Sequence, residues 1–236
     1  MRGARPEPAP AGPGRTTVRG HDRADSVRTT RSSYDAVAER YAELSAGSLA
    51  AAPLDRALPA AFADLVRADG AGPVVDVGCG PGQVTARLRT LGLMATGVDL
   101  SPAMIDLARA AHPDLRFTVG STTALDVADG ALGGVLARYS LIHTPPERLP
   151  EAFAEFRRVL APGGRLLLAF PALDDPDGVA EAFDHKVALA HRFSPDHVAR
   201  LLRDAGFEET ARLLRAPEEG ERGFPQAHLP ARRADG

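Results

Sequence analysis

Three glycines stand at alternate positions, Gly78, Gly80 and Gly82, directly after the apolar stretch that begins at Val74. Glycine has no side chain, so a turn of this kind lets the backbone approach a bound nucleotide-like ligand closely. Cys79 lies inside the turn, and its glycine neighbours favour a small buried side chain rather than a nucleophile. The spacing predicts a ligand-binding turn at the end of a strand.

The residues around this turn restrict which ligand it binds. A phosphate-binding P-loop would continue with lysine and a hydroxyl residue, but Gly82 is followed by Gln83. A dinucleotide fold has the spacing G-x-G-x-x-G, whereas this chain has G-x-G-x-G. Asp76 at the end of the strand would repel a pyrophosphate and attract an amine. S-adenosylmethionine, which carries an ammonium, a sulfonium and no phosphate, fits this charge.

A second acid follows about twenty residues later, at the end of the segment "MATGVDL", where Asp99 stands. In nucleoside-binding α/β folds, an acid at this distance accepts hydrogen bonds from ribose hydroxyls. Enzymes that use NAD have the same arrangement, and an ordinary turn between a strand and a helix would also explain it. Asp99 therefore supports a nucleoside ligand without choosing between the two cofactors.

The elements around these acids alternate between strand and helix. Strands are predicted at 74–78, 94–100, 115–120, 133–142 and 165–170, and helices at 34–44, 53–70, 82–92, 101–112 and 148–160. Ser101 followed by Pro102 is a strong helix start. This alternation predicts a parallel sheet with right-handed crossovers and helices on both faces.

The regular alternation of strand and helix ends after Phe170. Helices are predicted at 179–191 and 194–206, and two strands at 207–217 and 224–233, so the sheet is expected to end in an antiparallel hairpin. At the other end, residues 1–31 are rich in proline, glycine and arginine and too poor in large apolar groups to offset the entropy of ordering. We expect a disordered tail at 1–31 and one domain at 32–233.

Four segments resemble a known family when they are taken together. "VVDVGCGPG", "GVDLSPAMI", "GGVLARYSLIH" and "RVLAPGGRLLL" occur in the order and spacing of class I S-adenosylmethionine-dependent methyltransferases. The resemblance covers roughly residues 34 to 232. It implies an α/β fold with a doubly wound, Rossmann-like sheet of seven strands, mostly parallel with an antiparallel last strand, and helices on both faces.

The resemblance also implies roles for individual residues. Asp76 and the backbone of the glycine turn would hold the methionine part of S-adenosylmethionine, and Asp99 would bind its ribose. The remaining predicted cofactor contacts are Leu100 and Met104 beside the adenine, Ser121 or Thr122 at its amino group, and Tyr34 in a helix that covers the cofactor. Many relatives have an acid where this chain has Ser121, and a hydroxyl accepts that hydrogen bond more weakly.

Methyl transfer needs alignment and the exclusion of water, and it needs a base only when the nucleophile arrives protonated. His143 follows the fourth strand and is the first candidate for a base or substrate contact; the alternative is that it caps or packs the turn before Pro145. Tyr139 could line the substrate pocket or belong to the core. Arg138 could bind an acidic substrate group or be solvated.

Composition narrows the functional class further. The net charge is −3, the hydrophobic fraction is 44% and Cys79 is the only cysteine. These values favour a small-molecule partner over nucleic acid or membrane, exclude an internal disulfide and suggest a cytoplasmic protein. The acidic loop "DDPD" at 174–177 is expected to be solvated, so no metal is predicted. The oligomeric state stays open.

Four functional hypotheses follow. The first is methyl transfer from S-adenosylmethionine to an oxygen, nitrogen or carbon of a small molecule. The second is a non-catalytic binding or scaffold protein of the same fold. The third is a nicotinamide-dependent oxidoreductase, against which the glycine spacing and Asp76 argue. The fourth is aminopropyl transfer, for which the acidic loop is the single hint.

Overall fold

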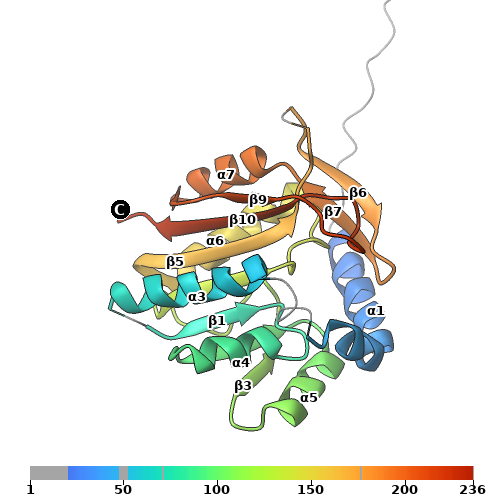
Figure 1. The fold of residues 1–236 in the computed structure, drawn as a ribbon, viewed down its shortest axis with the longest axis horizontal. Helices are drawn as coiled ribbons and strands as arrows, with labels where there is room; N and C mark the ends of the chain where they lie inside the picture. Colours follow the sequence, from blue (N-terminus) through green and yellow to red (C-terminus); the bar gives the residue numbers. More distant parts are fainter. Residues whose placement is uncertain (1–20, 48–52, 71, 176, 236) are drawn as a thin grey trace, which may run out of the picture.

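The structure is a computed structural model that describes residues 21–47, 53–70, 72–175 and 177–235 (Figure 1). The helices are α1 (His21–Ser45), α3 (Pro53–Ala68), α4 (Gln83–Thr90), α5 (Pro102–Ala111), α6 (Leu149–Val159) and α7 (Pro195–Asp204), with a 3-10 turn, η1 (Pro146–Arg148). The strands are β1 (Val74–Val77), β2 (Ala95–Asp99), β3 (Arg116–Val119), β4 (Leu132–Arg138), β5 (Leu160–Pro171), β6 (Ala180–Asp184), β7 (Leu189–Phe193), β8 (Phe207–Glu209), β9 (Leu213–Arg215) and β10 (Gln226–Arg233).

The central sheet has the strand order β3-β2-β1-β4-β5-β10-β8, with β9 paired to another stretch of β10. Strands β1 to β5 run parallel, while β10 runs antiparallel to β5. The predicted sheet with an antiparallel last strand is confirmed. The first strand of the terminal hairpin differs from the prediction. It is divided into two short strands, β8 and β9, which together occupy the seventh position in the sheet.

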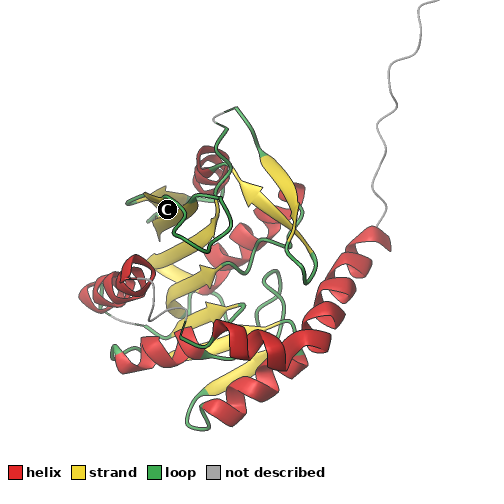
Figure 2. Ribbon diagram, turned by 45° about the vertical axis from the view of Figure 1, so that its right-hand side comes forward, coloured by secondary structure: helices red, strands yellow, loops and turns green. Residues whose placement is uncertain are grey.

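Alternate residues of the strands supply two cores, one on each face of the sheet. Val74 and Leu136 pack with Phe62 of α3 and with α4. Val75 and Val135 face the other way and pack with α6 and α7. All four residues of β1 are buried, as expected for a parallel strand covered by helices on both faces. The helix layers on either side of the sheet are visible in Figure 2.

Residues 179–191 were predicted to be helical, and this prediction was wrong. They form most of an antiparallel hairpin, β6–β7, which stands apart from the main sheet. The turn is stabilised locally because Asp184 Oδ1 accepts a hydrogen bond from the Lys186 amide at 2.8 Å, and Lys186 has a φ of 72°. Packing also favours the hairpin, since Ala190 and Phe193 are buried against the core.

The predicted boundary of the N-terminal tail was also wrong for residues 21–31, because α1 already begins at His21. Residues 1–20 lie outside the described part of the chain. The helix gains tertiary support despite its polar composition, since Asp35 accepts hydrogen bonds from Ser101 and Ala103 and Ala38 is buried. Val27, Thr30 and Tyr34 lie on one face of the helix and line a pocket. None of the described helices is both long and apolar enough to cross a membrane.

A cluster of buried charges ties the end of β4 to α3, β9 and β10. Asp55 of α3 is 5% exposed, and its carboxylate lies 2.8 Å from Arg138, 3.7 Å from Arg215 and 3.2 Å from His228. Burial alone would raise the pKa of Asp55, but the His228 contact and the charge of Arg138 outweigh it and lower this pKa. The ionised carboxylate therefore stabilises the fold.

We predict that Asp55→Ala lowers the free energy of unfolding by about 3–5 kcal/mol, because it leaves the largely buried Arg138 without its counter-charge and removes one of the acids that surround Arg215. Urea denaturation at pH 7 measures this. Asp64→Ala is the matched control, since Asp64 lies on the same helix and pairs with Arg67 but is 70% exposed. The control should lose less than ~1 kcal/mol. Equal losses in the two variants would contradict the role given to the buried cluster.

Candidate active site

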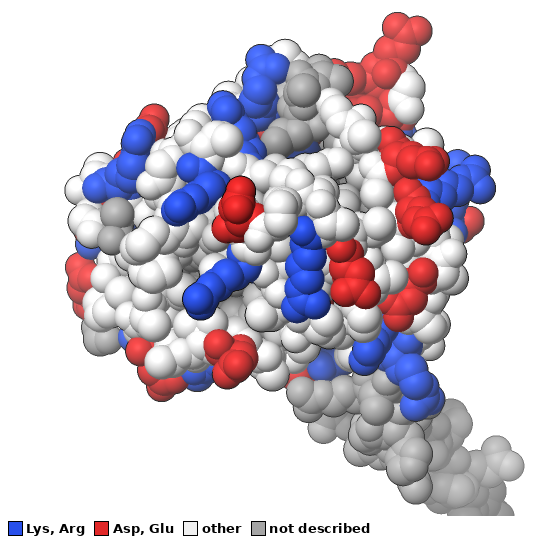
Figure 3. Space-filling view, turned by 90° about the horizontal axis from the view of Figure 1, so that it is seen from below, with Lys and Arg blue, Asp and Glu red and all other residues white. Residues whose placement is uncertain are grey.

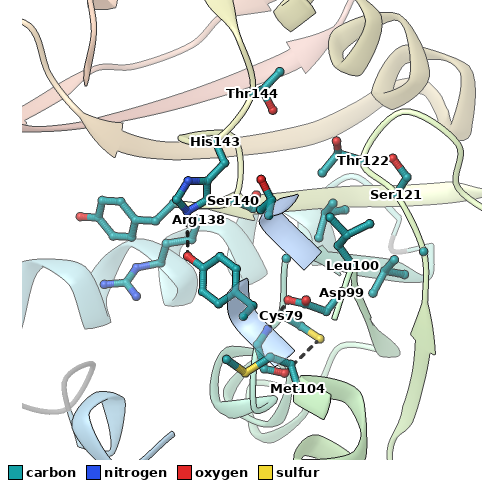
Figure 4. A pocket seen from close by; sticks show the side chains of 18 of the residues that line it. Cys79, Asp99, Leu100, Met104, Ser121, Thr122, Arg138, Ser140, His143 and Thr144 are labelled. Carbon is teal, nitrogen blue, oxygen red and sulfur yellow. Dashed lines mark hydrogen bonds between the residues drawn. The ribbon is translucent and has the colours of Figure 1, made fainter. Parts of the chain in front are cut away.

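One pocket lies at the carboxyl ends of β1, β2 and β4, beneath α1. Open α/β sheets bind their ligands at this edge. In Figure 4, Leu100, Ser121 and Thr122 lie toward one side of the pocket, and His143 and Arg138 toward the other. The lining residues that the sequence predicted are Tyr34, Asp76, Gly78, Cys79, Gly80, Asp99, Leu100, Met104, Ser121, Thr122, Arg138, Tyr139 and His143. Gly82 is at the N-cap of α4, just outside this lining.

The glycine turn needs glycine for its backbone and for its packing. Gly78, Gly80 and Gly82 have φ values of 72°, 52° and 86°, which side-chain-bearing residues rarely adopt. A Cβ at position 78 would also lie 2.2 Å from the Cβ of Ser140, whereas one at position 80 would meet nothing within 4 Å. The turn therefore presents bare backbone to the pocket at Gly80.

Asp76 is 2% exposed and lines the pocket floor. Its Oδ2 accepts a hydrogen bond of 2.6 Å from the hydroxyl of Thr85, which is fully buried. Burial raises the pKa of Asp76 to about 6, although the Thr85 hydrogen bond and the charge of Arg138 oppose this. A cationic ligand group would stabilise the ionised form of Asp76, because it would offset the cost of removing the carboxylate from water. Thr85 was not singled out from the sequence.

Asp99 joins the glycine turn to the turn that follows β2. Its two carboxylate oxygens accept hydrogen bonds of 2.9 Å from the backbone amides of Gly80 and Ser101. Burial raises the pKa of Asp99, and these backbone hydrogen bonds lower it in part. Asp99 is therefore compatible with both interpretations of the sequence, the nucleoside contact and the ordinary turn residue. Its side chain stabilises the turn and also lines the pocket.

Helix α1 is docked on the start of α5 by a carboxylate. Asp35 Oδ1 accepts hydrogen bonds from the hydroxyl of Ser101 at 2.6 Å and from the amide of Ala103 at 3.2 Å. The predicted cap is present as well, because Ser101 Oγ accepts a hydrogen bond from the Met104 amide. Anions are favourable at helix N-termini, so Asp35 both extends the cap and fixes α1 over the pocket.

The adjacent residue, Tyr34, reaches the opposite wall of the pocket. Its hydroxyl lies 2.8 Å from His143 Nε2, and His143 Nδ1 lies 2.8 Å from the carbonyl oxygen of Leu189. Burial is the largest contribution that lowers the pKa of His143 and raises that of Tyr34. The structure thus brings together two residues that the sequence assigned to different tasks.

Tyr139 and Arg138 mark the end of β4. Tyr139 has a φ of 56°, an uncommon conformation for a residue with a side chain and one that often occurs at functional sites. Burial raises the pKa of Tyr139 to about 12. The guanidinium of Arg138 lies 4.9 Å from the Tyr139 ring centroid, and it is paired with Asp55. Arg138 therefore lines the pocket as an already neutralised group rather than as a free cation.

At the other end of the pocket, Ser121 and Thr122 lie in the loop after β3. Ser121 Oγ lies 3.1 Å from Thr123 Oγ1, which constrains this loop. Cys79 is buried, its thiol contacts the carbonyl of Gly80 at 3.6 Å, and burial raises its pKa. A thiol with a raised pKa is a poor nucleophile, in agreement with the packing role predicted for Cys79.

Tyr41 is a pocket residue that the sequence analysis missed. Its ring makes an edge contact with Tyr34 at a centroid distance of 5.6 Å. The signal was present in the spacing, because Val27, Thr30, Tyr34, Tyr41 and Ser45 follow one face of a helix at steps of three, four and seven residues. That face was not recognised because its first half was assigned to a disordered tail.

Comparison with known proteins agrees with this geometry. A family model described as "Methyltransferase domain" matches residues 74–164. An uncharacterized methyltransferase of Mycobacterium tuberculosis is 36% identical over 102 residues, covering 43% of this chain and 41% of that protein. An O-methyltransferase of Pyrenophora dematioidea is 32% identical over 144 residues, covering 57% and 53%. The chain thus spans about 41% of the length of the first of these relatives.

Among solved structures, the 1,6-didemethyltoxoflavin-N1-methyltransferase of Burkholderia thailandensis superposes with a TM-score of 0.69. It is 24% identical, and the match covers 98% of this chain and 94% of that one. That crystal structure contains 1,6-didemethyltoxoflavin and S-adenosylhomocysteine. The superposition shows that the two chains share one fold, and the family model shows that residues 74–164, which contain the glycine turn, are similar to a methyltransferase domain.

Proposed function

We propose that this protein transfers a methyl group from S-adenosylmethionine to a small-molecule acceptor. The observation that carries the proposal is a bare-backbone turn between the buried carboxylate of Asp76 and the partly buried carboxylate of Asp99, at the carboxyl edge of a parallel sheet. Oxidoreductase or aminopropyl chemistry has no comparable support, since the reported relatives are methyltransferases.

The residues present fit such a cofactor. The buried hydroxyl of Ser140 has no hydrogen-bond partner among the described residues, and it lies beside Gly78, where a polar ligand group would satisfy it. The two arginines of the lining, Arg138 and Arg148, are already paired with Asp55 and Glu151. The pocket thus offers carboxylates to a cation and no unpaired arginine to a pyrophosphate.

We assign individual roles on the basis of the family resemblance, and the pocket lining supports them. Asp76 and the glycine backbone would hold the ammonium end, and Asp99 would meet the ribose through lone pairs that the backbone amides leave free. Leu100 and Met104 would contact the adenine, with Ser121 or Thr122 near its amino group. When bound, the cofactor supplies an activated methyl group attached to a sulfonium.

The protein's own contribution is positioning and exclusion of water. Helix α1 covers the pocket and is fixed on one wall by Asp35 and on the other by Tyr34. Such a roof holds donor and acceptor in line and limits competing hydrolysis. His143 lies on the side of the pocket away from Ser121 and Thr122, and we assign that side to the acceptor. Tyr139 also lines the pocket, and we assign it to the acceptor as well.

A small-molecule acceptor agrees with the names of the relatives, which include O- and N-methyltransferases. The molecular surface supports the same choice over nucleic acid. On the face drawn in Figure 3, lysine and arginine are interspersed with aspartate and glutamate rather than gathered in a basic area. We place the enzyme in the cytoplasm.

The first test is binding. Calorimetry should detect S-adenosylhomocysteine binding, and Asp76→Asn should weaken it by about 1.5–3 kcal/mol, because a charge-assisted hydrogen bond is lost. Asp106→Asn is the matched control, since Asp106 is 76% exposed on α5 and outside the pocket lining. An unchanged affinity in Asp76→Asn would refute the placement of the ammonium, and preferential binding of NAD would refute the cofactor.

The pH dependence of the same binding provides a second test. Only the ionised form of Asp76 attracts the ammonium, and its pKa is raised to about 6. At pH 5 roughly one molecule in ten carries this charge, so the affinity should be about tenfold weaker than at pH 7. The amine of the ligand stays protonated over this range. The profile of Asp76→Asn should be flat, and a sloping profile would assign the titration to another group.

Turnover is tested separately with S-adenosylmethionine labelled in its methyl group and a panel of phenols, amines and carboxylic acids. Labelled product from at least one class is the expected result. Tight cofactor binding without transfer to any class would instead favour the non-catalytic scaffold hypothesis.

A further inference from the structure

A chain of three polar groups crosses the acceptor side of the pocket, and its hydrogen bonds have one possible direction when the imidazole is neutral. The Leu189 carbonyl lies 2.8 Å from His143 Nδ1 and can only accept. Nδ1 must therefore carry a proton. In the neutral imidazole the other nitrogen, Nε2, is then an acceptor, so the Tyr34 hydroxyl at 2.8 Å donates to it.

The surroundings favour the neutral imidazole. His143 makes an edge contact with His185 at a ring-centroid distance of 5.2 Å, and His191 lies near it on β7. Burial is the main cause that lowers the pKa of His143, and the charge of His191 acts in the same direction. The pKa of His185 is lowered to about 4, also chiefly by burial. His143 thus has a free lone pair at neutral pH before Tyr34 donates to it.

The direction of these bonds decides what Tyr34 offers to a ligand. Its proton is engaged with Nε2, so its oxygen is left with lone pairs in the pocket that Tyr34 lines together with Tyr41 and Ser140. A ligand group that meets this oxygen must donate a hydrogen bond. A carboxylate acceptor has no proton to donate, whereas a hydroxyl does.

We propose that Tyr34 is the residue that contacts the nucleophile, that His143 acts through it, and that the acceptor is a neutral phenolic or enolic hydroxyl. This inference rests on the proposed methyltransferase function. A hydroxyl is a weak nucleophile until its proton is removed, whereas an amine attacks through its own lone pair and a carboxylate arrives ionised. Proton removal by the Tyr34–His143 pair would therefore assist methylation of a hydroxyl, whereas methylation of an amine or a carboxylate does not need it.

The proposed reaction is balanced in protons and charge. The acceptor's O–H bond breaks as its proton passes to the Tyr34 oxygen, and the Tyr34 proton passes to His143 Nε2. The bond that forms joins the acceptor oxygen to the methyl carbon, and the bond that breaks joins that carbon to sulfur. One positive charge is thereby transferred from the sulfonium to the imidazolium, whose Nδ1–H still donates to Leu189.

The first test is spectroscopic and needs no turnover. Nitrogen-15 NMR of the full chain bound to S-adenosylhomocysteine at pH 7 should show His143 protonated at Nδ1 and unprotonated at Nε2. Tyr34→Phe should shift the Nε2 resonance and leave the Nδ1 proton in place. A proton on Nε2, or a doubly protonated ring, would overturn the inference.

The second test is a double-mutant cycle with phenol as the acceptor at pH 8. Tyr34→Phe and His143→Gln should each lower kcat at least ~100-fold with little change in KM, and the double variant should be no slower than either single variant, because the two residues act as one unit. His191→Gln is the control, since this imidazole is near His143 but outside the pocket lining. Thermal unfolding and S-adenosylhomocysteine binding check that each variant is folded.

A second phenol that is already ionised provides a control for proton removal. 4-Nitrophenol is largely ionised at pH 8, so its methylation should be nearly insensitive to Tyr34→Phe. Multiplicative losses in the double variant, or equal sensitivity with both phenols, would overturn the inference. Transfer to amines or benzoates alone would overturn the hydroxyl class while the proposed function survives. Failure to bind S-adenosylhomocysteine at all would count against the proposed function instead.

Discussion

The carboxylate of Asp99 is the constraint on which the site depends. Its two oxygens hold the amides of Gly80 and Ser101, so two turns that leave adjacent strands are locked at a fixed spacing. Ser101 in turn caps α5 and receives Asp35 from α1. One partly buried side chain thus connects the floor of the pocket to its roof. Because a carboxylate that is partly removed from water is costly without partners, these contacts favour a single arrangement of the loops.

The central part of the fold could be predicted because its signals are local. The alternation of strand and helix, the start of α5 at Ser101 and the glycine turn each follow from neighbouring residues. Most of the residues expected to contact the cofactor were assigned through the family resemblance, and apart from Gly82, which caps α4, they line one pocket. The antiparallel end of the sheet was expected both from the pattern after Phe170 and from the resemblance, whereas the strand order was not predicted.

What could not be predicted depends on contacts between distant segments. The β6–β7 hairpin looked helical because alanine-rich stretches satisfy both periods, and its turn is decided by Asp184 and by burial of Phe193. The pairing of Tyr34 with His143 joins residues separated by 109 positions. Arg138 was considered for substrate binding, yet Asp55 neutralises it, because α3 crosses beside the end of β4. No local pattern contains this information.

Strand β10 has a consequence for how the protein is made. It lies inside the sheet, between β5 on one side and β8 and β9 on the other, although it follows all of these strands in the sequence. During synthesis β5 therefore has an open edge, and β8 and β9 have no partner, until residues 226–233 leave the ribosome. An open strand edge readily pairs with other chains. Slow translation of this last segment would prolong an aggregation-prone state, whereas its rapid arrival closes the sheet.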